Sequence, residues 1–134
     1  MKIDGRCHCG FLSYVAEVDP EKVGICHCTD CQTLSSTAFR VTVPAEPGTL
    51  KLTGGEPTTY VKIAESGRER VQAFCPKCGT AIYAASEGPQ GLERISLRVG
   101  AMLQRAELTP KTQHWARSKQ AWVDGIGALP ARDK

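Results

Sequence analysis

The sequence predicts a mainly β fold, and three observations lead to this prediction. Short runs rich in β-branched and aromatic residues recur along the chain, separated by glycine, proline and aspartate. Only residues 29–35 read convincingly as helix. The chain has 134 residues, of which 41% are hydrophobic and 6% aromatic, so we expect one domain with a modest core that metal ions help to hold together.

The first half of the chain contains four predicted strands. Residues 11–18 alternate well enough between apolar and polar side chains to form a half-buried strand. Residues 38–43 form a β-branched run that ends before a proline. Residues 49–52 and 58–63 flank Gly54-Gly55, which predicts two adjacent strands joined by a turn.

The sequence of the second half of the chain predicts a hairpin, one more strand and an irregular C-terminal segment. Residues 70–74 lead into a Cys-Pro-Lys-Cys segment and residues 80–84 leave it, so this segment is expected at the tip of a hairpin. Residues 94–99 read as another strand, and a short second helix is possible near Ala101. Residues 125–134 contain glycine, proline and charged residues, which predicts a loose tail.

Seven cysteines dominate the chemistry of the chain. They form three clusters: Cys7-His8-Cys9, Cys26-His27-Cys28-Thr29-Asp30-Cys31 and Cys75-Pro76-Lys77-Cys78. The three clusters supply seven thiol ligands. Four of them match one closed tetrahedral zinc site, and the other three match a second site with a free position. An odd number of cysteines and a polar opening segment without the apolar run of a signal peptide argue against disulfides. We therefore expect a cytoplasmic protein with reduced, metal-binding thiols.

The first and third clusters are the natural partners in the closed site. Two thiols flanked by proline and glycine, as in Cys75-Pro76-Lys77-Cys78-Gly79, are typical of a zinc knuckle. We expect the first cluster on a strand, where Cys7 and Cys9 share one face and His8 points away from it. Four thiolates would then fasten the N-terminal segment to the distant hairpin and offset the entropy of closing that loop.

The middle cluster is left with three thiols. Cys26 and Cys28 share a face if the segment is extended, and Cys31 returns from the first turn of the predicted helix. Three ligands leave a fourth place for water or substrate. A metal ion held by three thiolates is a weak Lewis acid, but it can hold an incoming thiol as a reactive thiolate. The alternative is a purely structural site closed by a histidine: His8, His27 or His114.

Charge and hydropathy narrow the possible partners. The formal net charge is +3, and residues 88–134 hold eight Lys or Arg against four Asp or Glu. These charges are scattered, which indicates a solvated surface or a small anionic substrate rather than nucleic acid. No apolar run approaches the ~20 residues that span a bilayer, so we expect no membrane partner. The sequence also lacks the His- or Cys-x-Glu and Pro-Cys-x-x-Cys signature of zinc deaminases.

With these motifs the chain resembles the glutathione-dependent formaldehyde-activating enzyme family, which also includes centromere protein V. The resemblance is carried by Gly5-x-Cys7-His8-Cys9-Gly10, Cys26-His27-Cys28-x-x-Cys31 and Phe74-Cys75-x-x-Cys78-Gly79, with a softer match at His114-Trp115 and Trp122. One departure follows the middle cluster. The family often has Ser-Gly-Ser or Ser-Gly-Thr there, whereas this chain has Ser35-Ser36-Thr37.

The resemblance implies a β-tent fold of several small antiparallel sheets over residues 1–124, held by zinc, with residues 125–134 as the tail. It implies two zinc ions per chain. The structural ion is held by Cys7, Cys9, Cys75 and Cys78, and the catalytic ion by Cys26, Cys28 and Cys31. The implied activity is that of a carbon–sulfur lyase, in which glutathione adds to formaldehyde to give S-hydroxymethylglutathione.

Two functional hypotheses follow. In the first, glutathione or another small thiol binds the second metal ion, zinc or iron, and attacks a small carbonyl compound. Candidates to hold the carboxylates of glutathione are Arg40, Arg98 and Arg117. Trp115 and Phe39 are candidates for pocket walls, although both fit a core role equally well. In the second hypothesis the chain is a non-catalytic zinc module that binds a protein partner. It lacks the long basic tail that a chromatin role would favour.

Overall fold

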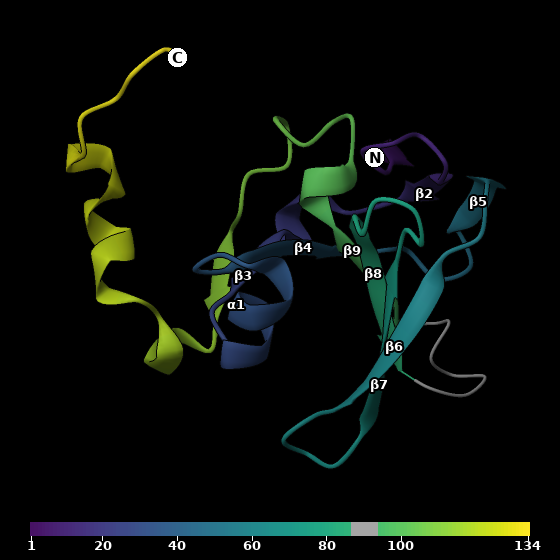
Figure 1. The fold of residues 1–134 in the computed structure, drawn as a ribbon, viewed down its shortest axis with the longest axis horizontal. Helices are drawn as coiled ribbons and strands as arrows, with labels where there is room; N and C mark the ends of the chain where they lie inside the picture. Colours follow the sequence, from purple (N-terminus) through teal and green to yellow (C-terminus); the bar gives the residue numbers. More distant parts are fainter. Residues whose placement is uncertain (87–93) are drawn as a thin grey trace.

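The computed structural model describes residues 1–86 and 94–134, and it confirms a mainly β fold built on two sheets (Figure 1). The smaller sheet has the order β1–β2–β5, formed by β1 (Lys2–Arg6), β2 (Ser13–Glu17) and β5 (Lys51–Gly54). The larger sheet has the order β10–β3–β4–β9–β8–β7–β6. Its strands are β3 (Gly24–Cys26), β4 (Arg40–Pro44), β6 (Thr58–Ile63), β7 (Glu69–Phe74), β8 (Ala81–Ser86), β9 (Ser96–Arg98) and β10 (Thr112–His114). The pairing of β10 with β3 is parallel, and the other strand pairs of the described residues are antiparallel.

The predicted helix is present with its expected bounds, as α1 (Thr29–Ser35). It ends at Ser36, which has a left-handed backbone with φ of 55°. Left-handed residues at helix ends are usually glycine, and this is the position at which the resembling family often has one. The other helices of the described residues are 3-10 helices: η1 (Pro20–Lys22), η3 (Val99–Ala101), η4 (Ala116–Ser118) and η5 (Ala121–Ala128). The helical turn expected near Ala101 is thus η3.

The prediction that β5 and β6 are adjacent strands is wrong. β5 pairs with β2 in the smaller sheet, whereas β6 pairs with β7 at the edge of the larger one. Gly54-Gly55 therefore connects two sheets rather than closing a hairpin. Gly55 has φ of 68°, and a Cβ atom there would lie 2.5 Å from the carbonyl oxygen of Phe11, so the connection needs a residue without a side chain.

The predicted hairpin around the third cysteine cluster is confirmed by the pairing of β7 with β8. The remaining predicted strands are also present, with shifted ends. The run at residues 38–43 becomes β4, which includes Pro44, and the run at residues 94–99 becomes the shorter β9. Pro44 is tolerated because it is the last residue of its strand, opposite Ser96.

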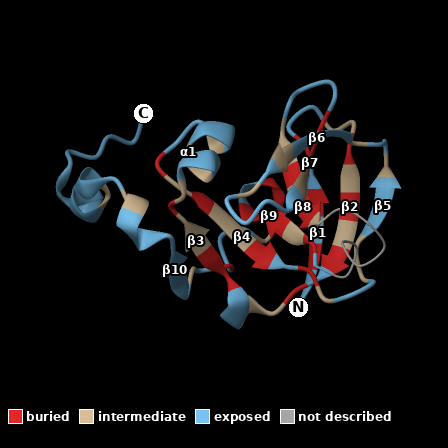
Figure 2. Cartoon of the chain, turned by 90° about the horizontal axis from the view of Figure 1, so that it is seen from below, coloured by how far each residue is buried: buried red, intermediate tan, exposed pale blue. Residues whose placement is uncertain are grey.

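One hydrophobic core joins the two sheets (Figure 2). Its most deeply buried members come from both sheets and from the segments after β9: Ile3, Leu12, Tyr14, Val18, Val43, Ile82, Leu97, Met102 and Leu108. Isolated bridges pair Gly5 with Met102 and Val18 with Ala45, so the backbone also links the small sheet to the rest of the domain.

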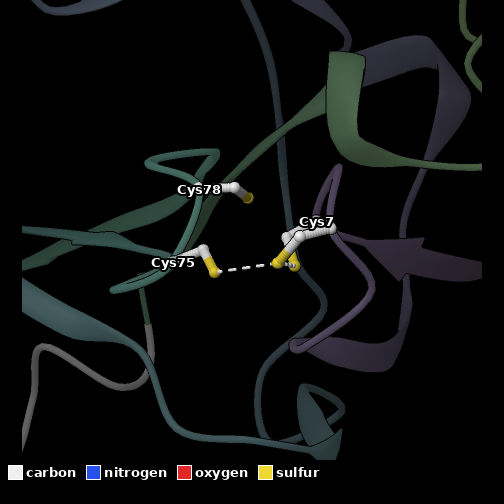
Figure 3. Close-up of side chains that lie close together, drawn as sticks. Cys7, Cys75 and Cys78 are labelled. Carbon is white, nitrogen blue, oxygen red and sulfur yellow. Dashed lines mark hydrogen bonds between the residues drawn. The ribbon is translucent and has the colours of Figure 1, made fainter.

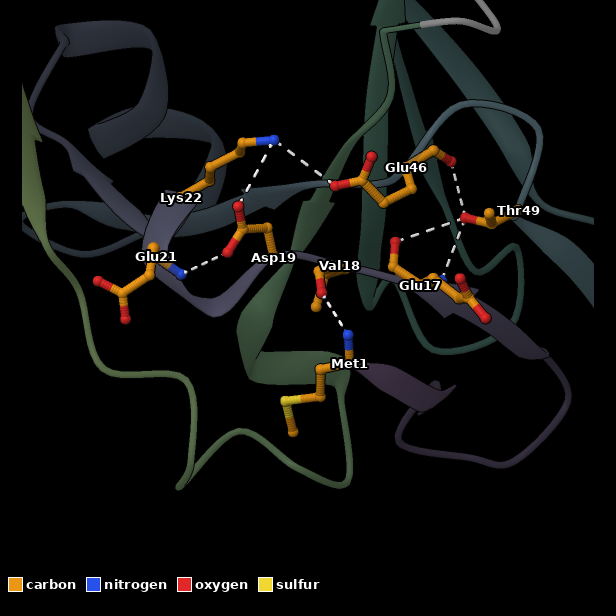
Figure 4. Close-up of polar contacts among 8 residues, drawn as sticks. All are labelled: Met1, Glu17, Val18, Asp19, Glu21, Lys22, Glu46 and Thr49. Atoms are coloured by element: carbon orange, nitrogen blue, oxygen red, sulfur yellow. Dashed lines mark hydrogen bonds and ion pairs between the residues drawn. The ribbon is translucent and has the colours of Figure 1, made fainter.

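The end of β2 is fixed by polar contacts to the chain before and after it (Figure 4). The Met1 nitrogen donates to the Val18 carbonyl at 2.8 Å, and the Val18 N–H donates to the Met1 carbonyl at 2.9 Å. On the other side, the Thr49 hydroxyl donates to the Glu46 carbonyl at 2.7 Å. Lys22 lies 3.6 Å from carboxylate oxygens of Asp19 and Glu46. These ion pairs are exposed and contribute little to stability.

The C-terminal segment lies apart from both sheets, at the left of Figures 1 and 2. Residues 125–128, expected to be loose, form the end of η5, whereas residues 129–134 have no regular structure. Trp122, Ile126 and Leu129 are exposed in this segment. Within the described residues, none of the helices combines the length and apolar character needed to cross a membrane.

Gly5, in the first motif, provides a test of the packing between β1 and β2. A Cβ atom at Gly5 would lie 1.8 Å from Cζ of the buried Tyr14 ring. Gly5→Ala should therefore lower the free energy of unfolding by about 3 kcal/mol, as overpacking does in cores. Chemical denaturation measures this change. Gly100→Ala is the matched control, because no heavy atom lies within 4 Å of the added Cβ. Equal stability of the two variants would contradict this packing.

Candidate metal centres

Four cysteine sulfur atoms converge between the turn after β1 and the β7–β8 hairpin (Figure 3). The Sγ atoms of Cys7, Cys9, Cys75 and Cys78 all lie within 4.8 Å of one another. Cys9 Sγ is 3.6 Å from Cys7 Sγ and 3.8 Å from Cys75 Sγ. A tetrahedral zinc ion with bonds of about 2.3 Å places its sulfur ligands about 3.8 Å apart, whereas a disulfide needs about 2.05 Å. This cysteine quartet therefore fits a metal ion and not a disulfide pair.

The first cluster reaches this site from a turn, so its prediction as a strand is wrong. β1 ends at Arg6, and the chain then folds back so that the Gly10 N–H donates to the Cys7 carbonyl at 3.0 Å. The hairpin turn is similar, because the Gly79 N–H donates to the Cys75 carbonyl at 2.9 Å. Both glycines have positive φ, 82° and 76°. Two tight turns, rather than alternation along a strand, bring the sulfur atoms together.

Hydrogen bonds to sulfur orient the quartet. The Leu12 N–H donates to Cys7 Sγ at 3.1 Å, and the Lys77 N–H donates to Cys75 Sγ at 3.4 Å. The Thr80 hydroxyl oxygen accepts from the His8 N–H at 3.0 Å and lies 3.1 Å from Cys78 Sγ. This contact with Thr80 is the main cause that lowers the pKa of Cys78 to about 5. Donors around the sulfur atoms favour thiolates, the form that binds metal.

Three further sulfur atoms converge where β3 meets α1. The Sγ atoms of Cys26, Cys28 and Cys31 lie within 4.8 Å of one another. Cys26 is the last residue of β3, and Cys28 is the N-cap of α1, where its sulfur accepts from the Cys31 N–H at 3.3 Å. A hydrogen bond with Cys31 lowers the pKa of Cys26 to about 5, and the same contact raises the pKa of Cys31. The donor set of this cysteine trio suits a thiophilic ion.

None of the histidines of the described residues has a ring nitrogen within 4.8 Å of all three sulfur atoms of the trio. His8 lies in the turn of the quartet. His27 is fully buried, and its Nε2 is 2.8 Å from Oε1 of Gln113. Its ring also makes an edge contact with Phe39. His114 Nε2 is 3.3 Å from the Thr112 hydroxyl. His114 is the cross-strand neighbour of Cys26 and lines the cavity beside the trio, but in this arrangement none of the three histidines completes the trio.

A cavity of about 720 Å³ opens in front of the trio. Its floor is one face of the larger sheet. Residues share a face of a sheet when they lie opposite each other in neighbouring strands or two apart along one strand. The strand register places these side chains on that face, in order across the sheet: Cys26, Arg40 and Thr42, Ser96 and Arg98, Ala84, Gln72 and Arg70, and Lys62. The face is strongly basic, which is unusual so close to a buried core.

Two arginines of this face, Arg98 and Arg40, are held by Gln72. Its Oε1 accepts from Arg98 Nη2 at 2.8 Å and from Arg40 Nη1 at 3.5 Å. Burial, and then repulsion by Arg40, lowers the pKa of Arg98 to about 9. Cys31 and Cys26 act on Arg98 in the opposite direction, so the trio and Arg98 interact electrostatically.

The candidate substrate-binding residues are only partly brought together. Arg98, Arg117 and Trp115 line the cavity, whereas Arg40 and Phe39 are not among its lining residues. Arg117 stacks 4.7 Å from the centre of the Trp115 ring, and its Nη2 lies 3.4 Å from a Glu65 carboxylate oxygen.

Other lining residues were missed from the sequence: Lys62, Arg70 and Gln72. The alternation of Arg70 and Gln72 along a strand was a signal that they share a face. The sequence did not show that this face adjoins the trio.

Thr80 provides a test of the quartet. Thr80→Val removes the hydroxyl between His8 and Cys78 while keeping the side-chain volume. We expect the affinity of the quartet for zinc to fall about tenfold, as for other residues that orient metal ligands. Competition with a chromophoric chelator measures this. The control Thr59→Val changes an exposed residue of β6. Unchanged zinc affinity in Thr80→Val would show that the hydroxyl does not support the site.

Comparisons with known proteins agree with these observations. A crystal structure of a Rhodobacter sphaeroides protein superimposes with a TM-score of 0.62 over 85% of this chain and 100% of that chain, at 19% sequence identity, and so shares the fold. No curated protein matches the sequence. The family model described as "Glutathione-dependent formaldehyde-activating enzyme" matches residues 2–118, which include both cysteine groups. The chain therefore belongs to the glutathione-dependent formaldehyde-activating enzyme family.

Proposed function

We propose that this protein is a zinc-dependent carbon–sulfur lyase-type enzyme that adds glutathione, or a similar small thiol, to a small carbonyl compound such as formaldehyde. One observation carries the proposal. Three sulfur donors converge at the wall of a cavity of about 720 Å³, with no histidine of the described chain completing the set. Family membership supports glutathione and formaldehyde as the substrates.

The two cysteine groups have different roles in this proposal. The quartet holds a structural zinc ion, because its four thiolates leave no free position. The trio of Cys26, Cys28 and Cys31 holds the catalytic ion. A metal ion bound there supplies one chemical effect, the lowering of the pKa of a fourth, incoming thiol. The seven free cysteines fit the reducing cytoplasm.

The reaction forms one bond between the thiol sulfur and the carbonyl carbon. The electron pair of the carbon–oxygen π bond moves to oxygen, which takes up the proton lost by the thiol, so the product is a hemithioacetal, which with formaldehyde is an S-hydroxymethyl thioether. The chain's own residues bind and orient the reactants. Arg98 and Arg117 offer guanidinium groups to carboxylates, and Trp115 forms one wall of the cavity. No general base is assigned.

A non-catalytic zinc module that binds a protein partner is the second candidate function. It is favoured by the exposed apolar side chains of Trp122, Ile126 and Leu129 on a segment that lies apart from the sheets. Residues 119–134 also lie outside the part of the chain that the family model matches. Exposed apolar groups of this kind are typical of interaction sites.

Metal and thiol titration separates the two functions. Protein produced with zinc should contain two zinc ions per chain. When cobalt replaces zinc, glutathione should change the visible spectrum of one ion only, because only the trio can accept a further sulfur ligand. A single bound ion, or a spectrum that does not respond to thiols, would favour the binding module.

Substitutions in the two groups should have unequal effects. Cys75→Ser removes a ligand of the structural ion, and we expect loss of the cooperative thermal transition, because binding of a structural metal contributes folding free energy. Cys28→Ser should leave a folded protein that retains about one zinc ion per chain and loses lyase activity. Circular dichroism and metal analysis measure both effects. If both variants unfold alike, the assignment of the two roles is incorrect.

A further inference from the structure

Two guanidinium groups are buried beside the cavity. Arg40 is 6% exposed and Arg98 is 8% exposed, and Arg98 lines the cavity. Among the described residues neither arginine forms an ion pair with a carboxylate. Buried charges are costly unless they are paired and hydrogen-bonded, so an arginine pair without a carboxylate partner indicates that negative charge comes from the neighbouring trio and from outside the chain.

The hydrogen bonds of these arginines are also incomplete. Both share one acceptor, Oε1 of Gln72, which is itself only 9% exposed. Arg40 Nη2 and Arg98 Nε are buried without a hydrogen-bond partner. A buried donor that stays unsatisfied is destabilising. Of the two side chains only that of Arg98 lines the cavity, so a carboxylate entering the cavity would meet the guanidinium group of Arg98, with Arg40 behind it.

The other cations of the cavity already have protein partners. Lys62 Nζ lies 2.6 Å from a carboxylate oxygen of Asp30, and Arg117 is paired with Glu65. Arg70 donates to the Ser86 hydroxyl at 2.8 Å. The Ser86 hydroxyl is neutral, so Arg70 also keeps an uncompensated positive charge, but the buried cations without a carboxylate partner are Arg40 and Arg98. Arg40 is the direct cross-strand neighbour of Cys26, which places this pair beside the trio.

The trio alone does not balance this charge. Three thiolates around a divalent ion carry one net negative charge, whereas Arg40 and Arg98 together carry two positive charges. One anionic charge more is needed for neutrality. A thiol bound as thiolate would provide it at the metal, but the free N–H groups of the arginines need acceptors of their own.

We propose that Arg98, supported by Gln72 and Arg40, forms a carboxylate-binding subsite beside the trio. The inference rests on the proposed function, because it specifies substrates of that same site. The carboxylate belongs either to the thiol or to the carbonyl compound, which would then be a 2-oxo acid rather than an uncharged aldehyde. Arg98 acts here as a binding residue that selects the substrate class.

Matched pairs of ligands identify the source of the carboxylate. Binding of 3-mercaptopropionate and of its amide to the cobalt-substituted protein is followed by visible spectroscopy. Binding of glyoxylate and of acetaldehyde to the zinc-loaded protein is followed by calorimetry. In at least one pair the carboxylate should bind tenfold or more tightly, which is about what charge-assisted hydrogen bonds contribute.

Three variants assign this preference to the subsite. The ratio that matters is the affinity for the carboxylate ligand divided by the affinity for its uncharged counterpart. Arg98→Met should reduce this ratio to about one. Gln72→Glu should do the same with almost no change of volume, because it gives the arginines an internal carboxylate, and it is expected to fold even if Arg98→Met does not. Arg105→Met is the control. It removes an exposed arginine outside the cavity lining, and the ratio should stay at the wild-type value.

The outcomes separate the inference from the proposed function. The subsite is supported if one ligand pair shows a preference for the carboxylate and Gln72→Glu loses that preference. The pair that shows it, thiol or carbonyl, identifies which substrate carries the carboxylate. Equal affinities within both pairs, or a preference that survives in Gln72→Glu, overturn it. A cobalt spectrum that no thiol changes contradicts the proposed function alone, since the carbonyl pair still tests the subsite.

Discussion

The fold depends on the convergence of four cysteine sulfur atoms from two distant turns. One turn follows β1 in the smaller sheet, and the other is the tip of the β7–β8 hairpin in the larger sheet. A metal ion held by the quartet would connect the two sheets, which the described backbone links through isolated bridges. Cys7 and Cys75 are also part of the hydrophobic core, so the same residues provide packing and candidate metal ligands. In a domain of this size a metal ion held there would supplement a modest core.

The larger sheet positions the trio. Cys26 ends β3, and α1 begins immediately afterwards, so strand and helix each present sulfur to the same point. Gln32 of α1 donates to the carbonyls of His27 at 2.7 Å and of Ser118 at 3.0 Å, which holds the segment carrying Trp115 beside the cavity. Strand register then carries the basic side chains to the same face. The three sulfur atoms, the cavity and the arginines thus form one site.

The sequence predicted the local elements well and the long-range ones poorly. The bounds of α1, the hairpin around Cys75 and the grouping of seven cysteines depend on near neighbours along the chain. Gly54-Gly55 looked like a hairpin turn, yet the strands on either side enter different sheets, which only tertiary packing determines. The first cluster was expected on a strand and lies in a turn. Its pairing with the third cluster was predicted from the number of thiols that a closed metal site needs, and that number does not depend on the backbone path. The basic face required the register of six strands, and no local pattern contains that information.

The central claim is that the seven cysteines are shared unequally, with one ion enclosed and one left open. Diffraction from zinc-loaded crystals at the zinc absorption edge tests it most directly. The account predicts two anomalous peaks, one bound by four sulfur atoms and one by the sulfur atoms of Cys26, Cys28 and Cys31 with a water or added thiol in the fourth place. A trio without metal, linked by a disulfide, or closed by a side chain of the protein would contradict the account.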